Sequence, residues 1–246
     1  MSLYSEIPNN ELELFKLISS EFKTVFDVGC RDDLDLYHIN PDCEYHLFEP
    51  FSDAIISIKG KMSGLINNNI TLNEFGLSDE AKDNCVYYSN TQSFIPHWYV
   101  PPIDSGHRFS LEKLDDYVID KKINKIDFLK IDVEGLDYHV ILGGLETIKT
   151  NNIVSYIQIE YNGGIKQYVD LLDNFEFYLM VEPKLLNTIT LNNDINVDFN
   201  QSLVKLDNII IKFIDETISP TGCGGNIFGV NKNIELDKNI ILKVSK

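Results

Sequence analysis

Basic residues are scarce in this sequence, where 21 Lys and Arg stand against 38 Asp and Glu and give a formal net charge of −17. So acidic a chain repels a phosphate backbone unless a local basic patch overcomes the repulsion, and the sequence contains no such Lys/Arg cluster. It also contains no apolar run long enough to cross a bilayer, and its segment 1–15 is acidic. We therefore expect a cytoplasmic protein that binds neither nucleic acid nor a membrane.

Cysteine is equally scarce. The four cysteines, Cys30, Cys43, Cys85 and Cys223, are scattered and form no C-x-x-C pair of the kind that holds zinc or makes a redox dithiol. We expect four reduced thiols and assign no metal ligands. The sequence leaves the oligomeric state open.

What the sequence does contain is the composition of an ordinary globular protein, with 43% hydrophobic and 24% charged residues. Its 246 residues fit one elaborated domain, 1–246, in which short apolar runs alternate with segments of helical periodicity. The expected strands are 23–29, 44–49, 70–75, 126–133, 154–160, 175–181 and 226–230, and the expected helices are 10–22, 110–118 capped by Ser110, 136–148 and 165–172. This alternation predicts an α/β protein with a doubly wound, Rossmann-like sheet.

Two longer segments interrupt the alternation. The first, 83–109, contains Pro101 and Pro102, which forbid a regular central strand, and the second, 183–224, is a long connection before the final strand. Each follows a strand that ends at the carboxyl edge of the sheet, so we expect both insertions to lie over that face. Aromatic side chains of the first insertion would form a wall of an acceptor pocket or a small satellite core; they are Phe94, His97, Trp98, Tyr99 and His107.

The turn after the first strand contains only one glycine. A dinucleotide site needs G-x-G-x-x-G here, and only Gly29 is present. Asp32, Asp33 and Asp35 add negative charge where a phosphate would otherwise bind. S-adenosylmethionine suits the turn better, because it carries no phosphate and its ammonium and sulfonium charges attract carboxylates, while Arg31 or backbone N–H groups can meet its carboxylate.

Acidic residues end the first two strands. Glu49 can accept both hydroxyl protons of a ribose, a feature that fits NAD and S-adenosylmethionine equally. The alternative for Asp27 and Glu49 is that each only caps a helix or a turn. Because the two acids stand at successive strand ends, we favour the functional interpretation.

A third set of ionisable residues lies at the end of the strand at 126–133. Alternation puts Lys130 and Asp132 on one side of a buried strand, with Glu134 and Gly135 at the turn. Ionisable groups are costly to bury, so their presence indicates a site, although an internal pair of Lys130 with Asp132 or Glu134 is the structural alternative.

Six sequence elements, in this order and spacing, resemble those of the FkbM-family methyltransferases. The most specific is Lys-Ile-Asp-Val-Glu-Gly at 130–135. The others are Phe-Asp-Val-Gly at 26–29, Leu-Phe-Glu-Pro at 47–50, Gly-Leu-Ser-Asp at 76–79, Leu-Asp-Asp-Tyr at 114–117 and Ile-Gln-Ile-Glu at 157–160. The resemblance covers about residues 23–160, with a weaker echo at 225–230.

The resemblance implies S-adenosylmethionine as cofactor and the class I methyltransferase fold, a mostly parallel sheet with an antiparallel last strand. It also implies acceptors that are mostly hydroxyls on sugars and natural products. The implied cofactor contacts are Asp27 and Gly29 with the methionine part, Glu49 with the ribose, Leu77 and Ser78 with the adenine edge, and Asp132 with the transferring methyl. Asp33 stands where the family usually has a second glycine.

The leading hypothesis is therefore an O-methyltransferase acting on a hydroxyl of a sugar, glycan or related small molecule. Its candidate catalytic residues are Lys130, Asp132, Glu134 and His139, of which the last three are candidate bases. His139 either points toward the site or lies on the solvated face of its helix. Two alternatives remain: a cofactor-binding or glycan-binding module of the same fold without turnover, and a nicotinamide-dependent oxidoreductase, which explains Glu49 but not the missing glycines.

Overall fold

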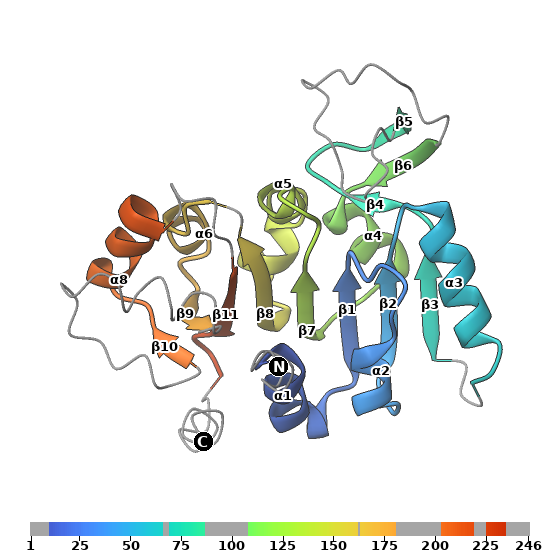
Figure 1. Ribbon diagram of the computed structural model, residues 1–246, viewed down its shortest axis with the longest axis horizontal. Coiled ribbons are helices and arrows are strands. Elements are labelled where there is room, and N and C mark those ends of the chain that lie inside the picture. Colours follow the sequence, from blue (N-terminus) through green and yellow to red (C-terminus); the bar gives the residue numbers. More distant parts are fainter. Residues whose placement is uncertain are drawn as a thin grey trace, which may run out of the picture.

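The computed structural model describes residues 10–65, 69–86, 108–161, 163–180, 203–218 and 225–234. These residues build one large sheet with helices on both faces and a small second sheet (Figure 1).

The large sheet has eight strands in the order β10-β9-β11-β8-β7-β1-β2-β3. They are β1 (Thr24–Val28), β2 (Glu44–Phe48), β3 (Ile70–Asn73), β7 (Ile126–Ile131), β8 (Val154–Tyr161), β9 (Phe175–Met180), β10 (Leu203–Lys205) and β11 (Gly225–Asn231). The five neighbouring strands β8, β7, β1, β2 and β3 pair in parallel, whereas β11 runs antiparallel between β8 and β9. This is the class I methyltransferase arrangement that the resemblance implies, with β10 added as an antiparallel edge strand.

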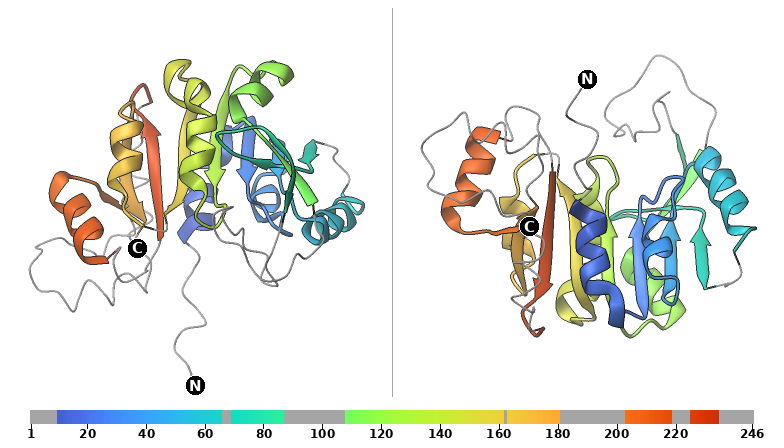
Figure 2. Two further views of the ribbon diagram at one scale, coloured as in Figure 1. Left: turned by 90° about the horizontal axis from the view of Figure 1, so that it is seen from above. Right: turned by 60° about the horizontal axis from the view of Figure 1, so that its bottom comes forward.

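Alternating side chains of the strands feed two apolar clusters, one on each face of the sheet. On β1, Val25 packs in a cluster with residues of α1 (Asn10–Ile18), α2 (Asp35–Ile39) and α3 (Ser52–Met62). Its neighbour Phe26 belongs to the other cluster, with residues of α4 (Leu114–Lys121), α5 (Asp137–Gly143) and α6 (Lys166–Leu171). In the right-hand view of Figure 2, α1 lies on the near face of the sheet. Both strand faces are thus buried, as continuous apolar runs predict.

Shorter helical segments extend several helices: a 3₁₀ turn at Ser19–Glu21, and π-type turns at Glu146–Thr150 and Ile214–Ile218, the latter following α8 (Asn208–Phe213). The expected helices at 10–22, 136–148 and 165–172 are therefore confirmed, with small shifts at their ends. No helix in the described ranges is long and apolar enough to span a bilayer.

The segment around Ser110 differs from its prediction. Ser110 caps no helix but lies in β6 (Arg108–Glu112), which pairs with β5 (Lys82–Val86) and β4 (Gly76–Leu77) in a three-stranded sheet. Helix α4 begins only at Leu114, after Lys113, which provides no side-chain cap. The conformation of Ser110 depends on strand pairing with a separate segment of the chain. A preference for helix capping reflects only neighbouring residues, so it could not predict this pairing.

The two insertions are described only in part. The first begins and ends as β5 and β6, so its ends are regular strands; residues 87–107, with the five aromatic and histidine side chains, lie outside the described residues. Figure 1 shows the small sheet beyond the carboxyl ends of β1 and β2. The described part of the second insertion forms β10, at the β9 edge, and α8. Its position over the cofactor face stays a prediction.

Asp127 connects the start of β1 to β7. Its side chain is buried, and Oδ2 accepts hydrogen bonds from the backbone N–H groups of Lys23, at 2.7 Å, and Thr24, at 3.1 Å. Lys125 lies 2.5 Å from the other oxygen. Asp127 therefore fixes the register at which the first strand joins the sheet.

Replacing Asp127 by alanine removes two charge-assisted hydrogen bonds and leaves the backbone N–H groups of Lys23 and Thr24 without this acceptor. We expect Asp127→Ala to lower the free energy of unfolding by about 2–4 kcal/mol in urea denaturation. Asp120→Ala, at an exposed side chain paired with its neighbour Lys121, is the control and should leave the urea midpoint unchanged. Equal midpoints for the two variants would contradict this role for Asp127.

Candidate active site

A cavity lies where the carboxyl ends of β1, β2 and β7 meet the small sheet. It encloses about 550 Å³ of space, part of it open to solvent. Its walls are largely apolar and include Phe48, Phe51, Phe109 and Leu111. The predicted site residues that line it are Gly29, Arg31, Glu49, Leu77, Asp132 and Glu134. The fold therefore brings these residues together from segments far apart in the chain, and their roles stay predictions.

Gly29 is required by the close approach of two turns. Its φ is +83°, and a Cβ at this position would lie 1.9 Å from the carbonyl oxygen of Asp132. The turns are also joined to the sheet, because Gly29 N–H donates to the Phe48 carbonyl and Asp132 N–H donates to the Val28 carbonyl, each at 3.0 Å. A side chain at Gly29 would have to push the turn after β7 away from the turn after β1.

Glu49 holds the turns after β1 and β2 in place. It is 2% exposed; Oε2 accepts from Arg31 N–H and Oε1 from Phe51 N–H, both at 2.9 Å. Burial raises the pKa of Glu49, and these two backbone hydrogen bonds partly oppose the rise. The turn-capping alternative thus describes real contacts. Each carboxylate oxygen retains capacity for a second hydrogen bond, so Glu49 can also serve a ligand hydroxyl.

Lys130 lies between two carboxylates at the ends of β1 and β7. Its Nζ is 3.2 Å from Oδ2 of Asp132 and 3.9 Å from Oδ1 of Asp27. Burial raises the pKa of Asp27 to about 7, and the attraction of Lys130 opposes that rise. For Lys130, burial lowers the pKa but the carboxylates of Asp27 and Asp132 outweigh it, so the ammonium is held charged. The internal pair expected as an alternative is present, beside the cavity and continuous with it through Asp132.

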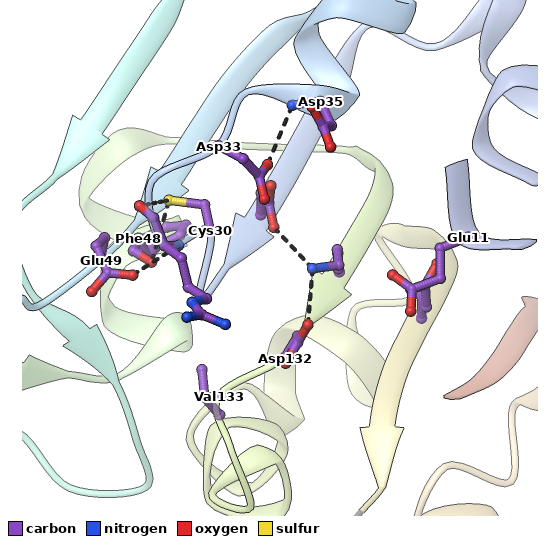
Figure 3. A network of polar contacts seen from close by, with 12 residues as sticks. Glu11, Cys30, Asp33, Asp35, Phe48, Glu49, Asp132 and Val133 are labelled. Atoms are coloured by element: carbon purple, nitrogen blue, oxygen red, sulfur yellow. Dashed lines mark hydrogen bonds and ion pairs between the residues drawn. The ribbon is translucent and has the colours of Figure 1, made fainter. Parts of the chain in front are cut away.

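Two further acids face the same region (Figure 3). Asp33, on the turn after β1, has its pKa raised by burial and accepts a hydrogen bond from Asp35 N–H at 3.3 Å. Glu11 comes from α1, and its Oε1 accepts from the Asn226 side chain at 2.6 Å. No sequence pattern predicts Glu11 at this place, because its position depends on how α1 packs.

Asp137 and Glu160 were not among the predicted site residues. Asp137 is fully buried and accepts hydrogen bonds from Val133 N–H at 3.0 Å and Gly135 N–H at 3.1 Å, so it fixes the turn after β7. Burial raises its pKa to about 6. Glu160, near the end of β8, hydrogen-bonds Asp132, and burial with nearby carboxylates raises its pKa to about 8. The motif at 157–160 was the available signal for Glu160.

The remaining predicted residues lie around the cavity without lining it. Asp27 and Lys130 lie behind Asp132, and the buried Ser78 donates through Oγ to Asp79 at 3.0 Å. His139 is half-exposed on α5, with Nδ1 at 3.1 Å from Asp79. This placement fits the solvated-face alternative for His139.

Three of the four cysteines lie among the described residues. Cys30, Cys43 and Cys85 are buried free thiols, and burial raises the pKa of each; Cys223 lies outside the described residues. Across the ranges that the structure describes, no group of three or more His, Cys, Asp and Glu side chains is arranged to hold a metal ion.

The close approach at Gly29 makes a specific prediction. Gly29→Ala should strongly destabilise the fold or displace the turn after β7, because the added methyl meets backbone rather than a flexible side chain. Gly60→Ala is the matched control, since Gly60 lies in α3 with no other atom within 4 Å of an added Cβ. It should be neutral or stabilising by up to about 1 kcal/mol. Thermal unfolding of both variants is the measurement, and a Gly29→Ala protein as stable as wild type would show that the turns are not in contact.

The raised pKa of Asp27 predicts how stability depends on pH. In the folded protein Asp27 keeps its proton up to about pH 7, whereas its ordinary value is 3.8. The folded state therefore binds more protons in this interval, and Asp27 contributes stability that is lost as pH rises through 7.

Urea denaturation at pH 5, 6, 7 and 8 tests this dependence. Asp27→Asn should flatten the decline of unfolding free energy with pH relative to wild type. His46, whose pKa is lowered by burial, acts in the opposite sense but is present in both proteins. Identical slopes in the two proteins would mean that Asp27 titrates normally.

A family model and a curated relative both match this chain. Residues 27–181 match the family model described as the methyltransferase FkbM domain. The 2-O-methyltransferase NoeI of Sinorhizobium fredii (strain NBRC 101917 / NGR234) is 22% identical over 205 residues, which cover 74% of this chain and 84% of NoeI.

Two solved structures give weaker matches. Methyltransferase FkbM from Methylobacillus flagellatus KT aligns with a TM-score of 0.44 and 12% identity, over 64% of this chain but only 39% of that one. An rRNA methylase from Streptococcus thermophilus aligns with a TM-score of 0.49 and 12% identity, over 94% and 99% of the two chains.

The family match covers more than half of the chain and contains the turns after β1, β2 and β7 that form the cavity. The strand order of the chain and the acidic residues at its strand ends agree with the sequence resemblance. The chain therefore belongs to the FkbM methyltransferase family, enzymes that take their methyl group from S-adenosylmethionine.

Proposed function

We propose that this enzyme methylates a hydroxyl oxygen of a sugar, a glycan or a related small molecule. The observation that carries the proposal is the position of Asp132, which lines the same cavity as Gly29 and Glu49. A hydroxyl group loses its proton during methylation, and a positioned carboxylate is a suitable acceptor for that proton. The name of the relative NoeI, a 2-O-methyltransferase, supports transfer to oxygen.

The residues that line the cavity support its assignment to the cofactor. Phe109 and Leu77 provide apolar surface for an adenine, and Glu49 provides carboxylate oxygens for a ribose. At Gly29 the backbone is bare, so a methionine moiety can approach it closely. When bound, S-adenosylmethionine supplies an electrophilic methyl group on a positively charged sulfur. The surrounding carboxylates complement that charge.

Charge also limits the class of acceptor that we propose. The surroundings of the cavity carry Asp33, Asp132, Glu134 and Glu160, against Lys130 and Arg31 as nearby cations. Lys130 is already paired with carboxylates, and the Arg31 guanidinium lies 4.0 Å from Glu134. A neutral or amine-bearing hydroxyl compound is attracted or tolerated here, whereas a polyanion such as RNA is repelled. We therefore propose a small-molecule or carbohydrate acceptor rather than nucleic acid.

A binding module without turnover is the second candidate. Two observations favour it: Asp33 occupies the position where the family usually has a glycine, and Lys130 lies 3.2 Å from the proposed base Asp132. Such a module would bind S-adenosylmethionine and its demethylated product but form no methylated product.

Asp132→Asn separates binding from chemistry, because asparagine keeps the size of the side chain but removes the carboxylate. We expect the affinity for S-adenosylmethionine to change modestly in calorimetry while kcat falls by about 10²- to 10⁴-fold. The assay uses a radiolabelled methyl donor and a panel of hydroxylated sugars and glycans. Asp170→Asn is the matched control, since Asp170 is an exposed residue of α6 paired with Lys166.

Three outcomes are decisive. Full turnover by Asp132→Asn would move the role of base to another residue. Cofactor binding by the wild type without methylation of any acceptor would favour the binding module. Absence of any cofactor binding at millimolar concentration would refute the assignment of the cavity.

A further inference from the structure

Asp132 and Glu160 form a pair of carboxyl groups at the ends of neighbouring strands. The strands β7 and β8 are parallel, with Ile131 opposite Ile159, so the residues that follow these two stand side by side. The two side chains are hydrogen-bonded. Two carboxyl groups can form such a bond only when one of them carries a proton.

The surroundings of the pair decide where the proton lies. The Lys130 ammonium is 3.2 Å from Oδ2 of Asp132, which places the negative charge of the pair on Asp132. Glu160 instead is half-buried and close to the carboxylates of Glu134 and Asp137, which oppose a charge on Glu160.

Two other elements near Glu160 contribute side chains without a charge. Helix α6 contributes Tyr168, a phenol whose pKa is raised first by burial. On the other side, β11 contributes Asn226, the register partner of Glu160, whose amide is bound to Glu11 of α1. Burial and the carboxylates of Asp132, Asp137 and Glu134 therefore raise the pKa of Glu160, which favours its neutral form at neutral pH.

We propose that protonated Glu160 is a positioning residue for methyl transfer: it donates a hydrogen bond to Asp132 and, together with Lys130, holds Asp132 as the carboxylate that deprotonates the acceptor hydroxyl. This inference rests on the function proposed above and adds a residue that does not line the cavity. With two partners, the Asp132 carboxylate has one fixed orientation, as a base needs.

The step balances with the groups already named. The hydroxyl oxygen forms a bond to the methyl carbon as the bond between that carbon and sulfur breaks, and the electron pair of the broken bond stays on sulfur. The hydroxyl proton passes to Asp132, and from there to water after the product leaves. Glu160 keeps its own proton throughout, so it is neither acid nor base in the reaction.

A glutamine at position 160 imitates the protonated acid, because its amide also donates a hydrogen bond and carries no charge. Glu160→Gln should therefore keep the wild-type kcat at pH 7 within about threefold, whereas Glu160→Ala, which lacks the donor, should lower kcat by about 10- to 100-fold with little change in the KM for S-adenosylmethionine. Glu216→Gln, at an exposed carboxylate paired with Lys212, is the control and should match wild type.

The pH profile gives a readout that a merely structural role would not change. In the wild type, kcat should fall above about pH 8, where Glu160 loses its proton and repels Asp132. In Glu160→Gln this alkaline decline should disappear. Loss of activity in Glu160→Gln equal to that in Glu160→Ala would overturn the proposal, as would an alkaline decline that persists in the glutamine variant.

A measurement without turnover separates this proposal from the proposed function. In protein labelled with ¹³C at the glutamate side-chain carboxyl, the resonance missing from Glu160→Gln identifies Glu160. It should titrate near pH 8; titration near the ordinary value of 4.5 would overturn the role of Glu160 even if the enzyme methylates hydroxyl groups. Conversely, a high pKa of Glu160 in a protein that methylates no acceptor would refute the proposed function, and the catalytic role of the pair with it.

Discussion

The ammonium of Lys130 is the interaction on which the carboxyl edge of the sheet depends. Asp27 and Asp132 lie beside it, and Glu11 adds to the negative potential around it. Without a cation in this position, ionised carboxylates at the ends of β1 and β7 would repel one another in a region of limited solvent access. Lys130 thus makes it possible to concentrate acidic side chains at the edge where we propose that a positively charged methyl donor binds.

Two buried acids give the cavity its shape in the same way. Glu49 accepts hydrogen bonds from two backbone N–H groups of the turns after β1 and β2, and Asp137 accepts from two in the turn after β7. The turns after β1 and β7 each contain a non-glycine residue with positive φ, Arg31 at 53° and Glu134 at 57° respectively. Such backbone conformations are unfavourable in isolation. The hydrogen bonds that Glu49 and Asp137 accept stabilise these turns and so the orientation of Arg31 and Glu134.

The sequence predicts most of this architecture because its strands are short apolar runs that end in polar residues. The turns at 27–33, 49–51 and 132–135 could be placed together, since parallel strands bring their carboxyl ends to one edge. Glu11 and Asn226 could not be placed, because their meeting depends on helix packing and on the antiparallel entry of β11. Ser110 failed for a related reason: its strand partner lies in a segment with no alternating pattern. Asp137 looked like an ordinary helix-start residue, and only its two backbone contacts reveal its role.

The antiparallel direction of β11 has a consequence for how the protein is made. Because β11 enters the sheet from the carboxyl edge, its residue Asn226 joins Glu11 across 215 positions of sequence. The ribosome produces α1, β1 and β7 before it produces β11, so the polar groups at the end of β8 lack this neighbour until β11 has been made. Until then, Glu160 has solvent where β11 will lie, and a nascent chain can hold the parallel half of the sheet without yet having the finished electrostatic environment of its carboxyl pair.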